Sequence, residues 1–170
     1  MISKHASMMM LVTASLMIAP TVAWAQAQPT QMSASEAASD STGVVEGIYA
    51  AFATGDGAAL AAAFAPDLVW VEAENGPYAD RNPYVGPGAV FEGVFGRIGQ
   101  EWTNFAATPQ TLLPSGSRVV ALGRYTGVNK ATGEALDAQF VHVWTVADGK
   151  VVAFQQYTDT AQWNDTVAPD

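Results

Sequence analysis

The C-terminal stretch Asp137–Asp159 constrains the fold more than any other part of this sequence, because it has the pattern of a β-hairpin. Two runs rich in Val, Phe, Trp and Tyr flank Asp148-Gly149-Lys150, a combination typical of a tight turn between antiparallel strands. Side chains alternate between the two faces of a strand, so each run presents three of them on a shared face. These are Phe140, His142 and Trp144 on the first run and Phe154, Gln156 and Thr158 on the return run. One histidine among aromatic residues, opposite a glutamine, predicts a pocket wall rather than a plain core.

Composition and charge narrow the possible partners. A chain of 170 residues is long enough for one domain with a substantial core. Hydrophobic residues make up 49% and charged residues 14%, which indicates a compact rather than a disordered chain. The formal net charge of −9 argues against nucleic acid or an anionic membrane surface as the partner. The absence of cysteine excludes disulfides, thiol catalysis and cysteine-bound metals.

Residues 1–25 have the pattern of a secretory signal peptide. Lys4 and His5 precede a mostly apolar run, Met8–Ala19, and Ala23-Trp24-Ala25 matches the small-residue exit of a cleavage site. Cleavage after Ala25 predicts a periplasmic or secreted protein with no stable membrane insertion. The apolar run is short for a transmembrane span, and an uncleaved anchor is the alternative. Cleavage would also leave His142 as the only histidine.

The rest of the chain is predicted to form one α+β domain, residues 36–161, between a disordered leader, residues 26–35, and a flexible C-terminal tail, residues 162–170. Apolar residues at helical spacing predict a first helix capped by Ser35 or Ser39. Because short turns join the last four predicted strands, these strands are expected to be antiparallel. The further elements are helices at Ala58–Phe64 and Gly88–Trp102, a loop at Glu74–Pro87, and strands at Leu68–Glu72, Asn104–Leu113, Arg118–Val128, Ala135–Val146 and Val151–Asp159.

The inventory of reactive residues limits the chemistry. One mature histidine without cysteine cannot form a histidine-rich zinc site. A carboxylate-only magnesium or calcium site stays possible, although no acidic cluster has the spacing of a ligand loop. The sequence has no G-x-S-x-G elbow, no P-loop and no dinucleotide fingerprint, so no cofactor and no metal are predicted. Two options remain, proton chemistry by a carboxylate and a histidine or binding without chemistry.

Three features together resemble a known family: Gly55-Asp56 ahead of a strand, Tyr84-Val85-Gly86-Pro87 ahead of a helix, and the hairpin with its Asp-Gly-Lys turn. They resemble the SnoaL-like and ketosteroid-isomerase-like members of the nuclear-transport-factor-2-like superfamily, over about residues 36–161. The resemblance implies a cone-like α+β fold, in which a curved antiparallel sheet wraps around three helices from the N-terminal half and encloses a pocket. It also implies a homodimer. Fold analogy alone does not settle activity.

The resemblance also assigns roles to individual positions. The general-base aspartate of the isomerases falls on Glu72, and their oxyanion-hole aspartic acid falls on His142. Their oxyanion-hole tyrosine falls on Ile48, with Tyr49 one residue away, and one residue on a helix is a rotation of about 100°. The pocket side, by the same mapping and by strand parity, is expected to hold the ligand-binding residues Trp70, Tyr84, Phe140, Trp144, Phe154, Gln156 and Thr158.

Related epoxide hydrolases use an arginine and two aspartates, and these positions fall on Arg124, Thr126 and Gln156. Both acids are missing, which weakens that hydrolase interpretation. Arg124 has a simpler interpretation as the partner of a surface carboxylate. Asp159, on the opposite face from Gln156, is expected to cap the tail or to lie on a dimer face.

The leading hypothesis is a periplasmic SnoaL-like domain whose small apolar pocket catalyses proton transfer, of the isomerase or cyclase type, on a carbonyl-bearing small molecule. Glu72 would be the base and His142 the donor to the oxyanion. The simpler alternatives are an exposed Glu72 at the end of its strand and a core His142 bonded to Gln156 or to backbone. At the level of function, the alternatives are a non-catalytic module that binds a small ligand or a partner, and a carboxylate-assisted hydrolase or dehydratase.

Overall fold

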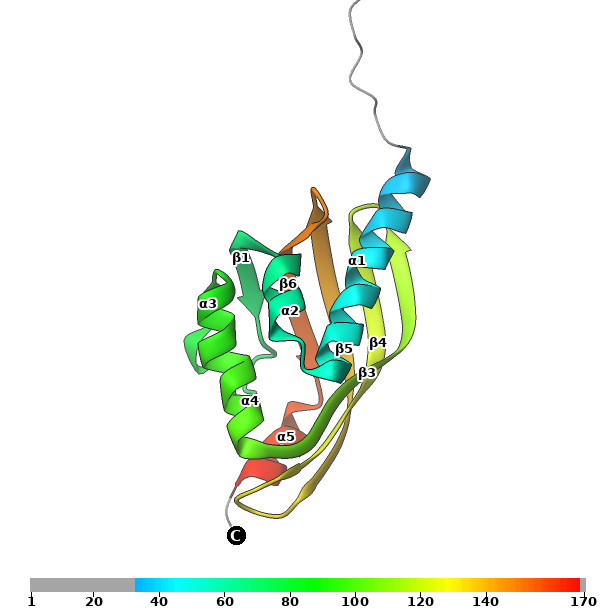
Figure 1. Cartoon of the computed structure of the whole chain (residues 1–170). Coiled ribbons are helices and arrows are strands. Elements are labelled where there is room, and N and C mark those ends of the chain that lie inside the picture. Colours follow the sequence, from blue (N-terminus) through cyan, green and yellow to red (C-terminus); the bar gives the residue numbers. More distant parts are fainter. Residues whose placement is uncertain (1–32, 169–170) are drawn as a thin grey trace, which may run out of the picture. The chain divides into compact units, whose positions relative to one another are not determined.

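Residues 33–168, the part of the chain that the computed structural model describes, fold around a curved sheet of six strands (Figure 1). The predicted signal peptide and most of the predicted leader lie outside the described residues. The strand order in the sheet is β2-β1-β6-β5-β4-β3. The strands are β1 (Phe64–Val71), β2 (Tyr84–Val85), β3 (Trp102–Ser115), β4 (Arg118–Asn129), β5 (Ala135–Ala147) and β6 (Lys150–Thr158).

Helix α1 (Ala34–Thr54) has clear start and stop signals in the sequence. The Ser33 hydroxyl accepts a hydrogen bond from the Glu36 N–H, and the Glu36 carboxylate accepts one from the Ser33 N–H, which forms a capping box. The cap therefore lies two residues before Ser35, the first residue predicted for that role. Gly55, at φ 68°, ends the helix in the left-handed conformation that glycine adopts most readily.

The other helical segments are the short helix α2 (Gly57–Ala63), the 3-10 turn η1 (Ala79–Arg81), the continuous run of α3 (Pro87–Val90), η2 (Phe91–Phe95) and α4 (Gly96–Glu101), and the C-terminal α5 (Thr160–Val167). In Figure 1, α1, α2 and the α3–α4 run lie on one face of the sheet. These are the three helices predicted for the N-terminal half. None of the helices within residues 33–168 has the length and the apolar character needed to cross a membrane.

The pairing of the strands confirms the predicted antiparallel order of the last four. β3, β4, β5 and β6 each pair antiparallel with the next, and in the β5–β6 hairpin His142 lies opposite Gln156. Strand β1 lies beside β6 and runs parallel to it, with Trp70 opposite Phe154, so the whole sheet is mixed. The short turns that predicted antiparallel pairing join only the last four strands and carry no information about β1.

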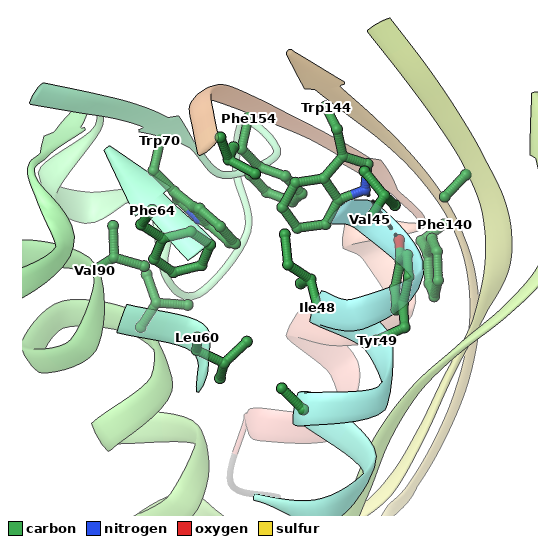
Figure 2. Close-up of a cluster of buried hydrophobic side chains, with 14 of the residues drawn as sticks. Val45, Ile48, Tyr49, Leu60, Phe64, Trp70, Val90, Phe140, Trp144 and Phe154 are labelled. Carbon is green, nitrogen blue, oxygen red and sulfur yellow. Dashed lines mark hydrogen bonds between the residues drawn. The ribbon is translucent and has the colours of Figure 1, made fainter. Parts of the chain in front are cut away.

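The core lies between the inner face of the sheet and the helices (Figure 2). Trp70 of β1 stacks on Phe154 of β6 with ring centroids 3.7 Å apart, and Trp144 of β5 packs against both. Ile48 and Tyr49 of α1 are both buried against this wall. Burial of such aromatic and aliphatic surface is the main favourable term in folding.

The C-terminal segment differs from the predicted tail. Thr160–Val167 forms α5, and the Asp159 carboxylate caps it by accepting a hydrogen bond from the Gln162 N–H at 3.1 Å, as expected for a capping residue. Trp163 is 3% exposed because its indole packs on the rings of Tyr78 and Trp102. Burial of Trp163 therefore stabilises a helix over residues 160–167, where a flexible tail was predicted from residue 162.

Candidate functional site

A cavity of about 730 Å³ lies between the inner face of the sheet and the helices. Its deep part is bounded by buried residues of β1, β4, β5 and β6. Its rim includes exposed Ala53 near the end of α1, exposed Gly99 on α4, and exposed Asn104 near the start of β3. A ligand would therefore enter between these three elements and reach the strands behind them. Pockets of this size take drug-sized molecules.

Glu72 lies in the deep part of the cavity, directly after β1, and is 3% exposed. The Trp70 indole N–H donates a hydrogen bond to its Oε1 at 2.5 Å, so residues 70 and 72 point to the same side. The Asn82 side chain fixes the Glu72 backbone, because its Oδ1 accepts from the Glu72 N–H at 2.9 Å and its Nδ2 donates to the Glu72 carbonyl at 2.8 Å.

The carboxyl group of Glu72 has an unusual pKa. Burial in this apolar environment raises its pKa to about 7, against the opposing effect of the hydrogen bonds from Trp70 and Gln156. Among the residues that line the cavity, none is Lys or Arg, so no cation offsets the burial. A carboxyl group with a pKa near neutrality is matched to the work of a general base. The simpler prediction, an exposed Glu72 at the end of its strand, is wrong, because the side chain is buried.

His142 lies between two tyrosines. Its Nδ1 is 2.8 Å from the Tyr49 hydroxyl and its Nε2 is 2.5 Å from the Tyr125 hydroxyl. Burial lowers the pKa of His142 to about 3, so its imidazole is neutral at ordinary pH. Burial also raises the pKa of Tyr49 and that of Tyr125, which keeps both hydroxyls protonated.

Gln156 connects this chain to Glu72. Its Oε1 must face the Ala73 N–H, from which it accepts a hydrogen bond at 3.2 Å, because a backbone N–H can only donate. Its Nε2 therefore faces the Tyr125 hydroxyl, to which it donates at 2.8 Å, and it also hydrogen-bonds the Glu72 carboxylate. One amide thus contacts both the carboxylate and a hydroxyl of the cavity.

Some predicted ligand-binding residues line the cavity and some do not. Trp70, Trp144, Phe154 and Gln156 line it together with Glu72 and His142, as strand parity predicted. The other three are Tyr84, Phe140 and Thr158, and the structure places them outside its lining.

Each of these three has a structural role. Tyr84 packs over Gly93, where a Cβ would lie 2.2 Å from its ring, and its hydroxyl donates to the Tyr78 carbonyl at 2.6 Å. Phe140 stacks behind His142, with ring centroids 3.9 Å apart. The Thr158 hydroxyl donates to the Gln139 carbonyl at the end of the hairpin.

On β4 the family mapping is displaced by one residue. Thr126 is exposed, and Arg124 pairs with Asp137 at 2.6 Å, as its simpler interpretation predicted. The buried residue between them is Tyr125, which lines the cavity and was not a candidate. The alternation of the strand itself carries the signal, since Val119, Ala121 and Tyr125 share one face.

On α1 the position mapped to Ile48 is apolar core, whereas Tyr49, one residue further, brings its hydroxyl to His142. Aromatic side chains that sequence reasoning did not select complete the cavity wall. They are Phe52, Tyr78, Phe91, Phe95, Trp102, Phe105 and Trp163.

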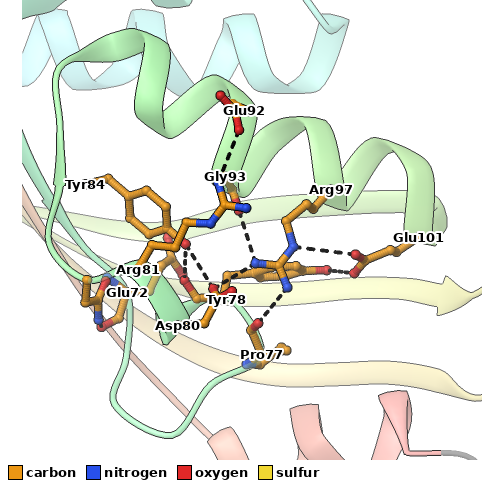
Figure 3. A network of polar contacts seen from close by, with 11 residues as sticks. Glu72, Pro77, Tyr78, Asp80, Arg81, Tyr84, Glu92, Gly93, Arg97 and Glu101 are labelled. Atoms are coloured by element: carbon orange, nitrogen blue, oxygen red, sulfur yellow. Dashed lines mark hydrogen bonds and ion pairs between the residues drawn. The ribbon is translucent and has the colours of Figure 1, made fainter.

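The loop that carries Asn82 is held in place by a cluster of polar contacts around Arg97 (Figure 3). The Arg97 guanidinium donates to the Asp80 carboxylate at 2.8 Å and to the Pro77 carbonyl at 3.0 Å, and it lies 4.8 Å from the centre of the Tyr78 ring. The Tyr78 hydroxyl donates to Glu101 at 2.7 Å. These four residues, Tyr78, Asp80, Arg97 and Glu101, are called the Arg97 cluster below.

Within residues 33–168, no three His, Asp or Glu side chains lie close enough together to hold a metal ion. The polar groups that meet in the deep cavity are the Glu72 carboxyl, the Tyr125 hydroxyl, the His142 imidazole and the Gln156 amide. This set can accept and donate protons at a neutral organic ligand.

The curved sheet, the three helices and the internal cavity define a member of the nuclear-transport-factor-2-like superfamily. Residues 45–154 match the model of the SnoaL-like domain family, and the chain belongs to that family.

Among solved structures, an NTF2-like protein from Burkholderia thailandensis is 33% identical and has a TM-score of 0.72, with 76% of this chain and 98% of that chain covered. An NTF2-like protein of unknown function from Burkholderia pseudomallei is 26% identical with a TM-score of 0.69, again with 76% and 98% covered. The putative polyketide cyclase IdmH from Streptomyces antibioticus, at 21% identity and a TM-score of 0.63 with 75% and 97% covered, shows the fold alone. A search of curated proteins gave no match.

Proposed function

We propose that this protein catalyses proton transfer, of the isomerase or cyclase type, on a neutral carbonyl-bearing molecule bound in the cavity. The observation that carries the proposal is the buried Glu72 carboxyl, whose pKa is about 7 and which shares an apolar cavity with a hydroxyl donor, Tyr125. Glu72 is the general base and Tyr125 donates a hydrogen bond to the substrate oxygen.

The chemical step balances with these two groups. The Glu72 carboxylate takes a proton from the carbon next to the substrate carbonyl. The C–H electron pair becomes the new carbon–carbon π bond, and the carbonyl π pair moves to oxygen, where the Tyr125 O–H stabilises the negative charge. Glu72, now protonated, returns its proton to another carbon in an isomerisation, or to a new alkoxide after the enolate carbon has attacked a second carbonyl in a cyclisation.

His142 has an indirect role in this proposal. Both ring nitrogens already face tyrosine hydroxyls, so His142 contacts the substrate oxygen through Tyr125 rather than as the direct donor expected from the sequence. The structural role expected of a core histidine bonded to Gln156 is also modified, because Tyr125 lies between the two.

The wall of the cavity supports a neutral, apolar substrate class. The lining residues include eleven Phe, Tyr and Trp side chains, and no lining residue is Lys or Arg. A phosphate or carboxylate group would therefore enter without a cationic partner and beside Glu72. A ring ketone or enone satisfies the walls by stacking and the deep end through a single oxygen.

Deuterium exchange tests the proposal without knowledge of the natural substrate. A panel of neutral cyclic ketones and enones is incubated with the protein in D2O, and loss of the proton signals next to the carbonyl is followed by NMR. We expect faster exchange than in buffer, and a loss of about 100-fold or more in Glu72→Gln. Glu74→Gln is the matched control, because Glu74 is exposed and does not line the cavity.

The same panel separates the other functional classes. Binding of the panel compounds without exchange by the wild-type protein would contradict the catalytic proposal and support the ligand-binding module. Hydrolysis of epoxides without exchange of ketones would support the carboxylate-assisted hydrolase instead.

We also propose a location outside the cytoplasm and a homodimer. The location is supported by the signal-peptide pattern of residues 1–25, and the mass of the protein recovered from a cell envelope fraction tests it. The homodimer is supported by an apolar row on the outer sheet face, where Leu122 (38% exposed), Val141 and Tyr157 (56% exposed) are cross-strand neighbours. Light scattering on the purified protein and on Tyr157→Lys tests it.

A further inference from the structure

Tyr49, His142 and Tyr125 form a hydrogen-bonded chain that has one more exchangeable proton than it has hydrogen bonds between its members. Tyr49, Tyr125 and the neutral imidazole each carry one exchangeable proton, which makes three. Only two contacts join them, Tyr49 to Nδ1 and Nε2 to Tyr125. A neutral imidazole has one N–H and one lone pair, so one tyrosine donates to it and the other accepts from it. The tyrosine that accepts retains a proton that is free for another partner.

The surroundings of the two tyrosines differ. The Tyr49 oxygen already accepts from the Trp144 indole N–H at 3.2 Å, and the Tyr49 ring packs against the rings of Phe52, Phe140 and Trp144. Within residues 33–168, the imidazole is the one acceptor that the Tyr49 hydroxyl reaches, and Tyr49 does not line the cavity. If His142 donated to Tyr49, the proton left on Tyr49 would be buried without an acceptor, which is unfavourable.

Tyr125 is placed differently. It lines the cavity, and its oxygen accepts from the Gln156 amide at 2.8 Å. A proton left on Tyr125 faces the space that a ligand occupies. The arrangement with fewer unsatisfied groups therefore has Tyr49 donating to Nδ1 and Nε2–H donating to Tyr125.

We infer that Tyr49 and Trp144 hold His142 in the Nε2–H tautomer, and that His142 is a positioning residue that directs the Tyr125 hydroxyl proton into the cavity. The tautomer is inferred from the hydrogen bonds alone, and only its effect on the reaction rests on the proposed function. Two N–H donors, from His142 and Gln156, converge on the Tyr125 oxygen. They stabilise the negative charge that this oxygen gains as its proton shifts towards the substrate oxyanion.

This arrangement gives the cavity a directional preference for its ligand. Tyr125 offers a donor and no free lone pair, because two N–H groups already use its oxygen. A ligand oxygen must therefore accept, as a ketone or an enolate does, and an O–H or N–H group in the same place would meet no acceptor on Tyr125. The specificity for carbonyl over alcohol thus originates at Tyr49, on the far side of the histidine.

Nitrogen-15 NMR of the ligand-free protein tests the tautomer directly and requires no substrate. Couplings of the ring nitrogens to Hδ2 and Hε1 identify which nitrogen carries the proton, and His5→Gln assigns the signals of His142. We expect a neutral Nε2–H imidazole at pH 6 in the wild-type protein and a smaller share of that tautomer in Tyr49→Phe, which lacks the hydroxyl that donates to Nδ1. A neutral Nδ1–H imidazole, or an imidazolium at that pH, would overturn the inference. An unchanged Nε2–H population in Tyr49→Phe would show that Tyr49 does not hold the tautomer and would do the same.

The exchange assay then separates the two hydroxyls, with a paired design in which each variant removes one hydroxyl from His142. Tyr125→Phe is expected to lower the rate constant for exchange about 100-fold, whereas Tyr49→Phe lowers it less than 10-fold. Equal losses in the two variants would contradict the assignment of Tyr125 as the contact to the ligand. An Nε2–H signal without any exchange would refute the proposed function and leave the tautomer inference standing.

Discussion

The cavity and the Arg97 cluster both contain carboxyl groups and tyrosines, but the pKa of the carboxyl group is raised in the cavity and lowered in the cluster. In the Arg97 cluster, two carboxylates and a tyrosine surround a guanidinium (Figure 3). Partial burial acts to raise the pKa of Asp80, but the hydrogen bond and charge of Arg97 hold it below its usual value. In the cavity, Glu72 has no cation, and burial raises its pKa to about 7. The two carboxyl groups thus differ in burial and in partner, because Asp80 is exposed and paired with Arg97, whereas Glu72 is buried without a cation.

The two regions also differ in how their hydroxyl protons are used. Tyr78 donates to Glu101 and accepts from the Trp102 indole N–H, so its hydrogen-bonding capacity is directed to the protein. Tyr125 accepts from Gln156 and contacts His142, and one proton in that chain remains for a ligand. In the proposed arrangement the cavity therefore has a carboxyl group and a hydroxyl proton available to a ligand, whereas in the Arg97 cluster these groups bind one another.

The largest expected effect is on the stability of the protein at low pH. Between pH 6.5 and 3, unfolded His142 binds a proton that the folded protein excludes, so the free energy of unfolding falls as the pH falls, by on the order of 5 kcal/mol in total. Glu72 acts in the opposite direction between pH 7 and 4.5, because the folded state binds its proton first. The two effects offset each other between pH 6.5 and 4.5, and the net loss is expected below pH 4.5.

Urea unfolding at a series of pH values measures this compensation. In Glu72→Gln the offset is absent, so the loss of stability should begin near pH 6.5 instead of near 4.5. Curves of the same shape for the wild-type protein and for the variant would show that the two groups do not titrate as their burial requires.

The fold and several residues of the cavity wall could be predicted from the sequence. The alternation of residues 137–159 predicted the hairpin, its inner face and the opposition of His142 and Gln156. The same alternation at the end of β1 places Trp70 and Glu72 on one side, where the Trp70 indole donates to the Glu72 carboxylate. Each of these rests on local periodicity, which a strand expresses regardless of what it packs against.

The missed residues depended on contacts between distant elements. Tyr125 was passed over because counting along the family pattern gave Arg124 and Thr126, although the alternation of β4 itself places Tyr125 on the inner face. The parallel pairing of β1 with β6 and the burial of Trp163 are set by tertiary packing, which short turns and local composition do not encode.

A second prediction compares the effects on stability of neutralising Glu72 and Asp80. At pH 8, Glu72→Gln should raise the free energy of unfolding by on the order of 3 kcal/mol, because it removes a buried charge whose pKa is raised from 4.5 to about 7. Asp80→Asn should lower the stability by up to about 1 kcal/mol, because it weakens a partly exposed ion pair. Thermal or urea unfolding checks both signs. Destabilisation by both variants would remove the distinction between the two regions.

Removal of the arginine is expected to have a smaller effect than Glu72→Gln. Arg97→Met keeps most of the side-chain stem but loses the ion pair with Asp80 and the contact with the Tyr78 ring, and should cost about 1–2 kcal/mol of stability. Arg97 does not line the cavity, so exchange activity at 25 °C should stay within about 2-fold of wild type. A large loss of activity in a folded Arg97→Met protein would show that the cluster does more than hold the loop.

A direct measurement of the Glu72 pKa tests the central claim, that the cavity holds a base poised at neutral pH. Carbon-13 NMR of side-chain carboxyl groups across a pH titration, with Glu72→Gln to assign the signal, reports that value without any substrate. We expect Glu72 to titrate near pH 7. Titration near its ordinary value of 4.5 would show that the carboxylate is solvated in the cavity and would contradict its role as the base.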